Sequence, residues 1–190
     1  MTARTRNLPI APHAEPARRK LPLADDAREV DARWRPIYAV WEITLRCDLA
    51  CNHCGSRAGR ARPDELTTDE ALDLVRQMKE LDVKEVTLIG GEAYLRDDWT
   101  LIARAARDAG MLVSITTGGR GLTRERAQEA KDAGVQAVSV SVDGLEATHD
   151  RLRGVKGSFR AALEAIENLK SVGLRVTANT QIGRASLGEI

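Results

Sequence analysis

The sequence has no large excess of charge of either sign and no long apolar run. Its 29 basic and 28 acidic side chains leave a formal net charge of +1, so the charge balance gives no support for a nucleic-acid or membrane-surface partner. No apolar run approaches the roughly 20 residues that cross a bilayer. The N-terminus contains arginine and proline but no apolar signal core. We therefore expect a soluble protein without a secretion signal.

Cysteine is also scarce. The chain has three, and all lie in one C-x3-C-x2-C stretch at Cys47, Cys51 and Cys54, so an odd number of thiols cannot all pair as disulfides. None is left elsewhere to build a second metal cluster. Grouped free thiols indicate a reducing, cytoplasmic environment. Three thiolates on one loop can hold three corners of a metal cluster and leave one corner open for chemistry.

Two different roles for the three cysteines stay open at this point. They could be incidental core residues, since cysteine is often buried, although this loop is polar and the spacing is tight. A structural zinc ion needs four ligands, and His53 could be the fourth, although Cys51, His53 and Cys54 are crowded for a tetrahedral site. The spacing favours an iron–sulfur cluster with three protein ligands.

Residues 1–36 differ from the rest of the chain. They hold five of the six prolines and a basic run at 18–20, and they show little periodicity. Such a composition is typical of a flexible or partly ordered extension; a docking arm for a partner is the alternative. We therefore divide the chain into an extension at 1–36 and a core domain at 37–190.

Short apolar strands alternate with amphipathic helices from residue 37 onward. An apolar run at 37–43 is followed by segments rich in β-branched residues, which predict strands at 83–89, 111–116, 135–142 and 174–180. Helical periodicity lies between them. Its start and stop signals are Thr67 with Glu70, Gly110, Thr123, Gly134, Ser158 and Gly173.

This βα repetition predicts an α/β fold with parallel strands and right-handed crossovers. Strand order is not readable, so an open doubly wound sheet and a barrel both stay open. In either fold, functional residues lie just after the C-terminal ends of strands. Four loops follow predicted strand ends, namely the cysteine loop, Gly90-Gly91-Glu92, Thr117-Gly118-Gly119 and Asp143-Gly144. We expect these loops to meet on one face.

In these features the sequence resembles the radical S-adenosylmethionine (radical SAM) superfamily from about Trp41 onward. The resemblance rests on the cysteine loop, on Gly90-Gly91-Glu92 and on the strand end Ser139-x-Ser141-x-Asp143-Gly144. The segment 149–154, followed by Gly157-Ser158-Phe159, is similar to the subgroup whose members often carry a C-terminal SPASM or twitch extension.

The resemblance implies a (βα)6 TIM-like barrel, of which this chain would be an N-terminal portion. We count about four βα units and a fifth strand ending near Arg184, so we expect a partial barrel, truncated after strand five. The alternative function is then a truncated, non-catalytic domain that binds a partner. Completion of the barrel by another chain is a further alternative.

The resemblance also implies a [4Fe-4S] cluster held by Cys47, Cys51 and Cys54, with SAM on the fourth iron. The implied reaction is reductive cleavage of SAM to a 5′-deoxyadenosyl radical that abstracts hydrogen from a substrate, without a catalytic side chain beyond the cluster. A flavodoxin or ferredoxin would supply the electron. The subgroup suggests peptide or protein maturation, and small-molecule biosynthesis is the second candidate.

Eight further residues would contact SAM on this resemblance. Gly90 and Gly91 would let backbone approach the cofactor, and Glu92 would accept hydrogen bonds from the SAM ammonium, although the family usually has proline where this chain has Ala93. The others are His53 near the adenine, the strand residues Thr116, Ser139 and Ser141, and Arg153, whose guanidinium would pair with the SAM carboxylate. For Asp143, capping of the following loop is the alternative role.

Overall fold

A computed structural model describes residues 36–189 of the chain. The expected extension, 1–36, therefore lies outside the described residues apart from Pro36. The strands are β1 (Tyr38–Glu42), β2 (Glu85–Ile89), β3 (Leu112–Thr117), β4 (Ala137–Ser141) and β5 (Arg175–Asn179). The helices are α2 (Thr68–Glu80), the 3-10 turn η1 (Ala93–Leu95), α3 (Trp99–Asp108), α4 (Arg124–Asp132), α5 (Glu146–Arg153) and α6 (Ser158–Ser171).

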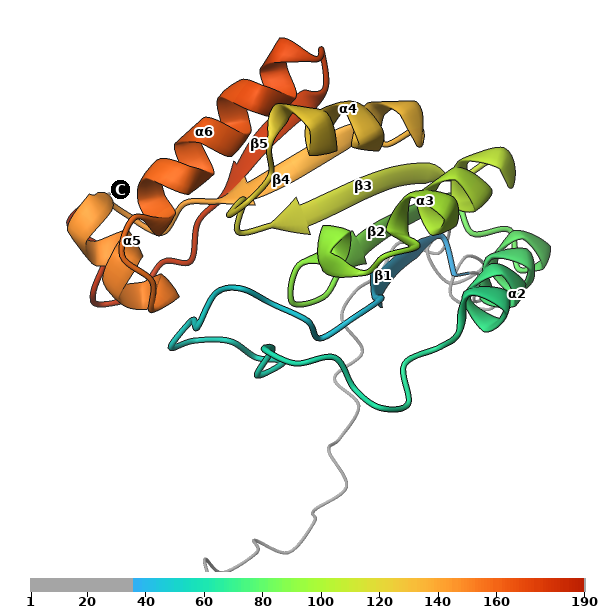
Figure 1. Cartoon of the computed structure of the whole chain (residues 1–190), viewed down its shortest axis with the longest axis horizontal. Coiled ribbons are helices and arrows are strands. Elements are labelled where there is room, and N and C mark those ends of the chain that lie inside the picture. The colour runs from blue at the N-terminus through green and yellow to red at the C-terminus, as the bar shows by residue number, and fades with distance from the viewer. Residues whose placement is uncertain (1–35, 190) are drawn as a thin grey trace, which may run out of the picture. The chain divides into compact units, whose positions relative to one another are not determined.

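The strands form one parallel sheet in the order β1-β2-β3-β4-β5. Because right-handed crossovers between consecutive parallel neighbours all pass on the same side, this order brings the helices to one face of the sheet, as Figure 1 shows. A doubly wound sheet reverses its order and carries helices on both faces, so that alternative is wrong. Within residues 36–189, β1 and β5 are the edge strands, and the sheet is an arc of a barrel.

Alternation along the strands separates the two faces of the sheet. Side chains facing the helices form the apolar core, including Val86, Leu88, Val113, Val138 and Val140. The opposite side, which no helix of residues 36–189 covers and which is here called the uncovered face, carries hydroxyl side chains instead. Across it, Thr87 hydrogen-bonds to Tyr38 at 2.8 Å and to Ser114 at 2.7 Å, and Thr177 donates to Ser139 at 3.0 Å.

The helix boundaries follow the predicted signals. Thr67 caps α2 in a capping box with Glu70, and the side chain of Thr123 accepts from the backbone of Arg126 at the start of α4. Gly110 and Gly134 follow α3 and α4 with φ of 93° and 89°, a conformation in which glycine has no Cβ penalty. Helix α5 and the short turn η1 were not predicted. No helix in the described part of the chain is both long and apolar enough to cross a membrane.

Candidate cluster and cofactor site

The four predicted loops meet at the C-terminal edge of the sheet, as expected of parallel strands. The cysteine loop follows β1 and lies beyond the strand ends in Figure 1. The turn after β2 is hydrogen-bonded to it, with Gly91 N donating to Thr44 O at 2.8 Å and Glu92 N to Arg46 O at 2.9 Å. The turn after β3 joins through Gly118 N, which donates to Glu92 Oε1 at 2.7 Å.

The glycines of the second turn are required by this contact. A Cβ on Gly90 would lie 2.3 Å from Thr44 O, and one on Gly91 would lie 2.3 Å from Arg46 O and 2.6 Å from the Cys47 Cβ. We expected both glycines for approach to a cofactor. Their packing shows another reason, which is that the turn presses against the backbone leading into Cys47; contact with SAM stays a prediction.

All three cysteines are free and half-buried. Within residues 36–189, each sulfur accepts one hydrogen bond: Cys47 Sγ from Leu49 N at 3.4 Å, Cys54 Sγ from Ala58 N at 3.3 Å, and Cys51 Sγ from Arg153 Nη1 at 3.7 Å. These donors stabilise negative charge on the sulfurs, which is the charge state of a metal ligand.

Burial raises the pKa of the Cys47 thiol to about 11, although the hydrogen bond from Leu49 N by itself lowers this pKa. Burial also raises the pKa of Cys51, and the positive charge of Arg153 opposes that rise. Without metal, Cys47 is therefore a neutral thiol near pH 7, and it has to lose its proton when a metal binds.

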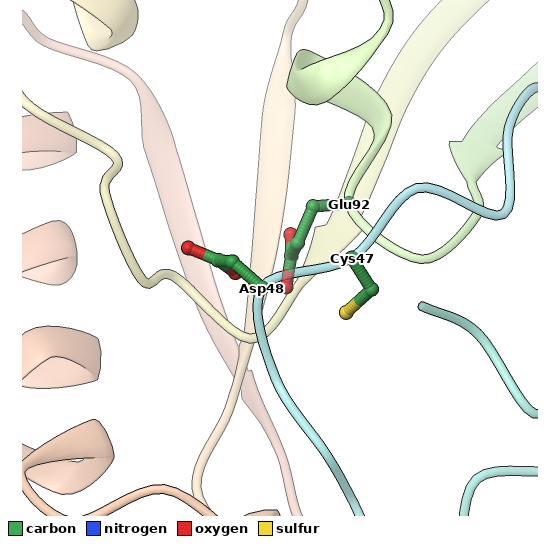
Figure 2. A group of neighbouring side chains, drawn as sticks. All are labelled: Cys47, Asp48 and Glu92. Carbon is green, nitrogen blue, oxygen red and sulfur yellow. The ribbon is translucent and has the colours of Figure 1, made fainter. Parts of the chain in front are cut away.

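The cysteine sulfurs do not surround a single ion. Among the described residues, one group of three potential ligands has all its ligand atoms within 4.8 Å of one another, and it is Cys47, Asp48 and Glu92 (Figure 2). Two sulfurs on one zinc ion lie no more than roughly 4.6 Å apart, since each Zn–S bond is about 2.3 Å. The wider spread of the three cysteines, which do not form such a group, argues against the zinc alternative and fits a larger cluster.

His53 does not complete a zinc site either. Its Nε2 lies 3.4 Å from Asp143 Oδ2, and its Nδ1 is buried with no hydrogen-bond partner among the residues that the structure describes. No group of metal-ligating side chains within residues 36–189 joins it to the cysteines. Its expected place beside the adenine stays a prediction.

Glu92 is a buried carboxylate that has no cationic partner within residues 36–189. Its side chain accepts hydrogen bonds from Thr117 Oγ1 and Gly118 N, its exposed fraction is 1%, and it makes no ion pair among the described residues. Burial raises its pKa to about 7. A carboxylate in this position gains stability from any cation that enters the site.

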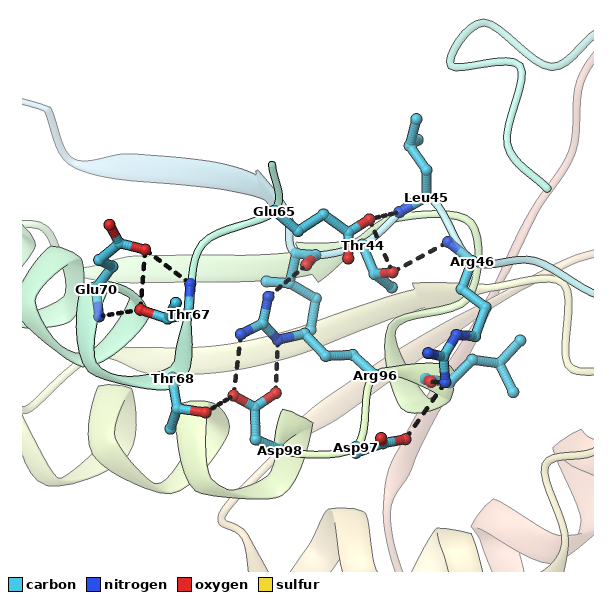
Figure 3. Close-up of polar contacts among 12 residues, drawn as sticks. Thr44, Leu45, Arg46, Glu65, Thr67, Thr68, Glu70, Arg96, Asp97 and Asp98 are labelled. Atoms are coloured by element: carbon cyan, nitrogen blue, oxygen red, sulfur yellow. Dashed lines mark hydrogen bonds and ion pairs between the residues drawn. The ribbon is translucent and has the colours of Figure 1, made fainter. Parts of the chain in front are cut away.

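The start of the cysteine loop is held by a second acidic residue, as Figure 3 shows. Glu65 Oε1 accepts from Thr44 Oγ1 at 3.1 Å and from Leu45 N at 2.7 Å. It also accepts from Arg62 N at 3.0 Å. Sequence reasoning missed this contact. The segment 62–67, here called the strap, thereby closes over the residues that lead into Cys47.

Arg153 does not point into open space. Its Nη2 lies 2.7 Å from Asp143 Oδ2, and its Nη1 reaches Cys51. Asp143 also accepts from Gln181 N at 3.1 Å, so it holds Arg153 and the chain after β5 together. The Nε of Arg153 is buried without a partner in the described residues, and the expected pairing with the SAM carboxylate stays a prediction.

Two of the expected strand residues lie on the uncovered face. Thr116 and Ser139 line a cavity of ≈ 300 Å³ together with Tyr38, Glu85, Thr87, Ser114, Ile115, Ala137, Thr177 and Asn179. Ser141, two residues after Ser139 and the last residue of β4, is buried. Thr116 and Ser139 are therefore brought together, and contact of all three residues with SAM stays a prediction.

A family model decides the membership. The Radical SAM superfamily model matches residues 41–184, which include the end of β1, the cysteine loop and β2 to β5. This chain belongs to the radical SAM superfamily. Its members use a [4Fe-4S] cluster and SAM, and the chain's relatives include SPASM/twitch-type maturases, as the sequence predicted.

The radical SAM chain is similar to curated proteins of two kinds. It is 39% identical over 157 residues to the AdoMet-dependent heme synthase of Methanosarcina barkeri, covering 82% of this chain and 45% of the relative. It is 38% identical over 141 residues to the mycofactocin maturase MftC of Mycolicibacterium smegmatis, covering 73% and 35%. The chain thus spans less than half the length of these relatives.

Solved structures share its fold. Streptococcus suis SuiB bound to S-adenosylmethionine superposes with a TM-score of 0.70 at 20% identity, over 82% of this chain and 36% of that one. SuiB bound to its precursor peptide SuiA gives a TM-score of 0.66 at 19% identity, over 86% and 38%. At this identity the likeness establishes the parallel α/β architecture.

Proposed function

We propose that this radical SAM chain is the catalytic core of an enzyme that binds a [4Fe-4S] cluster through Cys47, Cys51 and Cys54. The observation that carries the proposal is the environment of Glu92. This carboxylate is buried, it pairs with no cationic side chain of the part of the protein that the structure describes, and its ligand atom lies within 4.8 Å of the Cys47 sulfur. A molecule that bound the cluster and carried an ammonium group would meet both, and SAM has that group.

With both cofactors bound, the site would supply a 5′-deoxyadenosyl radical that abstracts hydrogen from a substrate. The protein's own residues have the supporting roles. Thr117 and Gly118 hold the Glu92 carboxylate toward the cysteine loop, so it would orient the ammonium. Glu65 fixes the backbone that leads into Cys47. Thr116, Ser139 and Asn179 line the part of the uncovered-face cavity that lies toward the C-terminal strand ends, where a substrate would reach the cluster.

The lining of this cavity supports a peptide substrate over a tetrapyrrole. Within the described residues its polar side chains are hydroxyls, Asn179 and one carboxylate, Glu85, without lysine or arginine. Hydroxyl and amide groups suit a peptide, whereas the several carboxylates of a tetrapyrrole call for cationic partners. Small-molecule biosynthesis, as in the heme-synthase relatives, is the alternative.

We also propose a flavodoxin or ferredoxin reductant and a cytoplasmic location.

Anaerobic reconstitution with iron and sulfide tests the cluster. The wild-type protein is expected to bind about four irons per chain and, once reduced, to give an electron paramagnetic resonance (EPR) signal that changes when SAM is added. A variant with Cys47, Cys51 and Cys54 all changed to alanine is the matched control and should bind no cluster. A colourless wild-type protein that holds only zinc would contradict the proposal.

A second candidate is a non-catalytic domain that binds a partner. The exposure of β5 favours it. Most residues of this strand are exposed, and within the described residues the strand pairs with β4 alone. An open strand edge is a template for pairing with another segment. Formation of 5′-deoxyadenosine from SAM by the reduced protein separates the two candidates, since a non-catalytic domain forms none.

A further inference from the structure

Arg153 lies at the C-terminal end of α5, beside the middle cysteine of the loop. Its guanidinium donates a hydrogen bond to Cys51 Sγ at 3.7 Å and forms an ion pair with Asp143, whose Oδ2 lies 2.7 Å from Arg153 Nη2. The exposed fractions of the Arg153 and Asp143 side chains are 12% and 1%. A guanidinium enclosed in this way is kept at the sulfur and does not turn out into solvent.

The same helix end also binds the backbone around Cys51. Ala50 N donates to Arg153 O at 3.1 Å, Asn52 N to Leu152 O at 2.9 Å, and Asn52 Nδ2 to Arg151 O at 2.8 Å. The last carbonyls of a helix lack partners within the helix, so the cysteine loop satisfies those of α5. Helix α5 thus fixes both the backbone and the sulfur of the middle cysteine.

The three sulfurs are not equivalent in their donors. Cys47 and Cys54 accept from the backbone N–H groups of Leu49 and Ala58, which are neutral. Cys51 accepts from a guanidinium, which is always charged. The Asp143 carboxylate contacts Arg153 Nη2, whereas Nη1 contacts Cys51. The positive end of this ion pair therefore faces the sulfur.

We propose that Arg153 is a positioning residue that holds the Cys51 sulfur for the cluster and raises the cluster's reduction potential. The inference rests on the proposed function. Reduction adds a negative charge to the cluster, and hydrogen bonds to the sulfurs and nearby charge set its potential. A charged donor at one sulfur stabilises the reduced state more than the oxidised one, and so makes the cluster easier to reduce.

Arg151 offers a matched control on the same helix. It is exposed, and its guanidinium contacts Thr148 at 3.4 Å instead of a cysteine. Arg153→Gln and Arg151→Gln remove the same charge two residues apart, but only the first removes the donor to Cys51. Both variants and the wild-type protein are reconstituted anaerobically in the absence of SAM, which separates this role from any contact between Arg153 and the cofactor.

The readouts are iron content and the midpoint potential from an EPR-monitored redox titration. Arg153→Gln is expected to bind less iron and to have a more negative midpoint potential than the wild type, whereas Arg151→Gln matches the wild type in both. If circular dichroism shows that Arg153→Gln does not fold, Arg153→Lys replaces it, since lysine has one nitrogen where the guanidinium uses Nη1 for Cys51 and Nη2 for Asp143; the same direction is expected.

Equal iron content and equal potential in Arg153→Gln and Arg151→Gln would overturn the inference, and so would a more positive potential in Arg153→Gln. Neither result touches the proposed function, because the wild-type protein still binds its cluster. A wild-type protein that binds no iron at all would instead contradict the proposed function itself.

Discussion

Glu92 is a residue whose surroundings disfavour its own charge. Burial raises its pKa to about 7, above the ordinary value of 4.5, so its ionised form weakens the fold of the metal-free protein as the pH rises through that range. Such a cost is common where a residue serves a ligand and not the fold. The charge becomes favourable when a cation occupies the site.

Glu92→Gln separates these two effects. The metal-free variant is expected to be at least as stable as the wild type at pH 8, because the neutral amide removes the buried charge. Its cluster-loaded form is expected to bind SAM roughly 10–100-fold more weakly, as loss of one charged hydrogen bond implies. Thermal unfolding and anaerobic equilibrium dialysis measure the two quantities. Unchanged SAM affinity would exclude the proposed contact with the ammonium.

The elements that position the site are the strap and α5. The connection between β1 and α2 contains no helix or strand that could fix the cysteine loop. The strap and α5 hold the loop instead. The strap holds the start of the loop through Glu65, and α5 holds its middle through the carbonyls of Leu152 and Arg153. The loop therefore has a defined shape before any metal binds.

Glu65→Ala tests the strap. It leaves the N–H groups of Leu45 and Arg62 without their acceptor, which is expected to cost roughly 1–3 kcal/mol of unfolding free energy and to lower the iron content after reconstitution. Asp64→Ala, which changes the exposed acid next to it, is the control and should match the wild type. Urea unfolding and iron analysis give the two values, and equal results for both variants would show that the strap does not organise the loop.

Sequence patterns predicted the elements with strong periodicity and missed those held by tertiary contacts. The strands, the capping box at Thr67 and the convergence of loops at one edge are confirmed. Helix α5 was missed because it is short and mostly polar, with Thr148 and His149 as its buried residues, so it has no apolar stripe. Without α5, the pair Asp143–Arg153 could not be predicted, since the helix brings these two side chains together.

The stability of the whole molecule depends on several carboxylates remaining ionised. The two hydrogen bonds from Arg96 lower the pKa of Asp98 below its ordinary 3.8, against the effect of burial. Burial alone would raise the pKa of Glu65, but the hydrogen bonds that it accepts outweigh this and hold its pKa below 4.5. A carboxylate whose pKa is lowered in the folded protein stabilises the fold at pH values above its ordinary pKa. This stabilisation is lost as the pH falls through the lowered pKa.

The metal-free protein is therefore expected to lose stability progressively below about pH 4.5, the ordinary pKa of Glu65. In Asp98→Asn this dependence should be shallower, because one of the titrating groups is gone, while the variant is less stable than the wild type near neutral pH. Thermal unfolding at a series of pH values measures both curves. Parallel curves for the two proteins would show that Asp98 is not among the groups responsible.

The docking of the cysteine loop on α5 has a consequence for how the protein is made. Asn52 and Arg151, which it joins, are 99 residues apart in the chain. A ribosome adding 5–20 residues per second needs about 5–20 s to pass from one to the other. During that interval Cys51 has emerged but the carbonyls that will hold its loop do not yet exist. Iron delivered to the nascent chain would meet three loose thiols, so insertion of a cluster belongs after synthesis of the second half of the sheet.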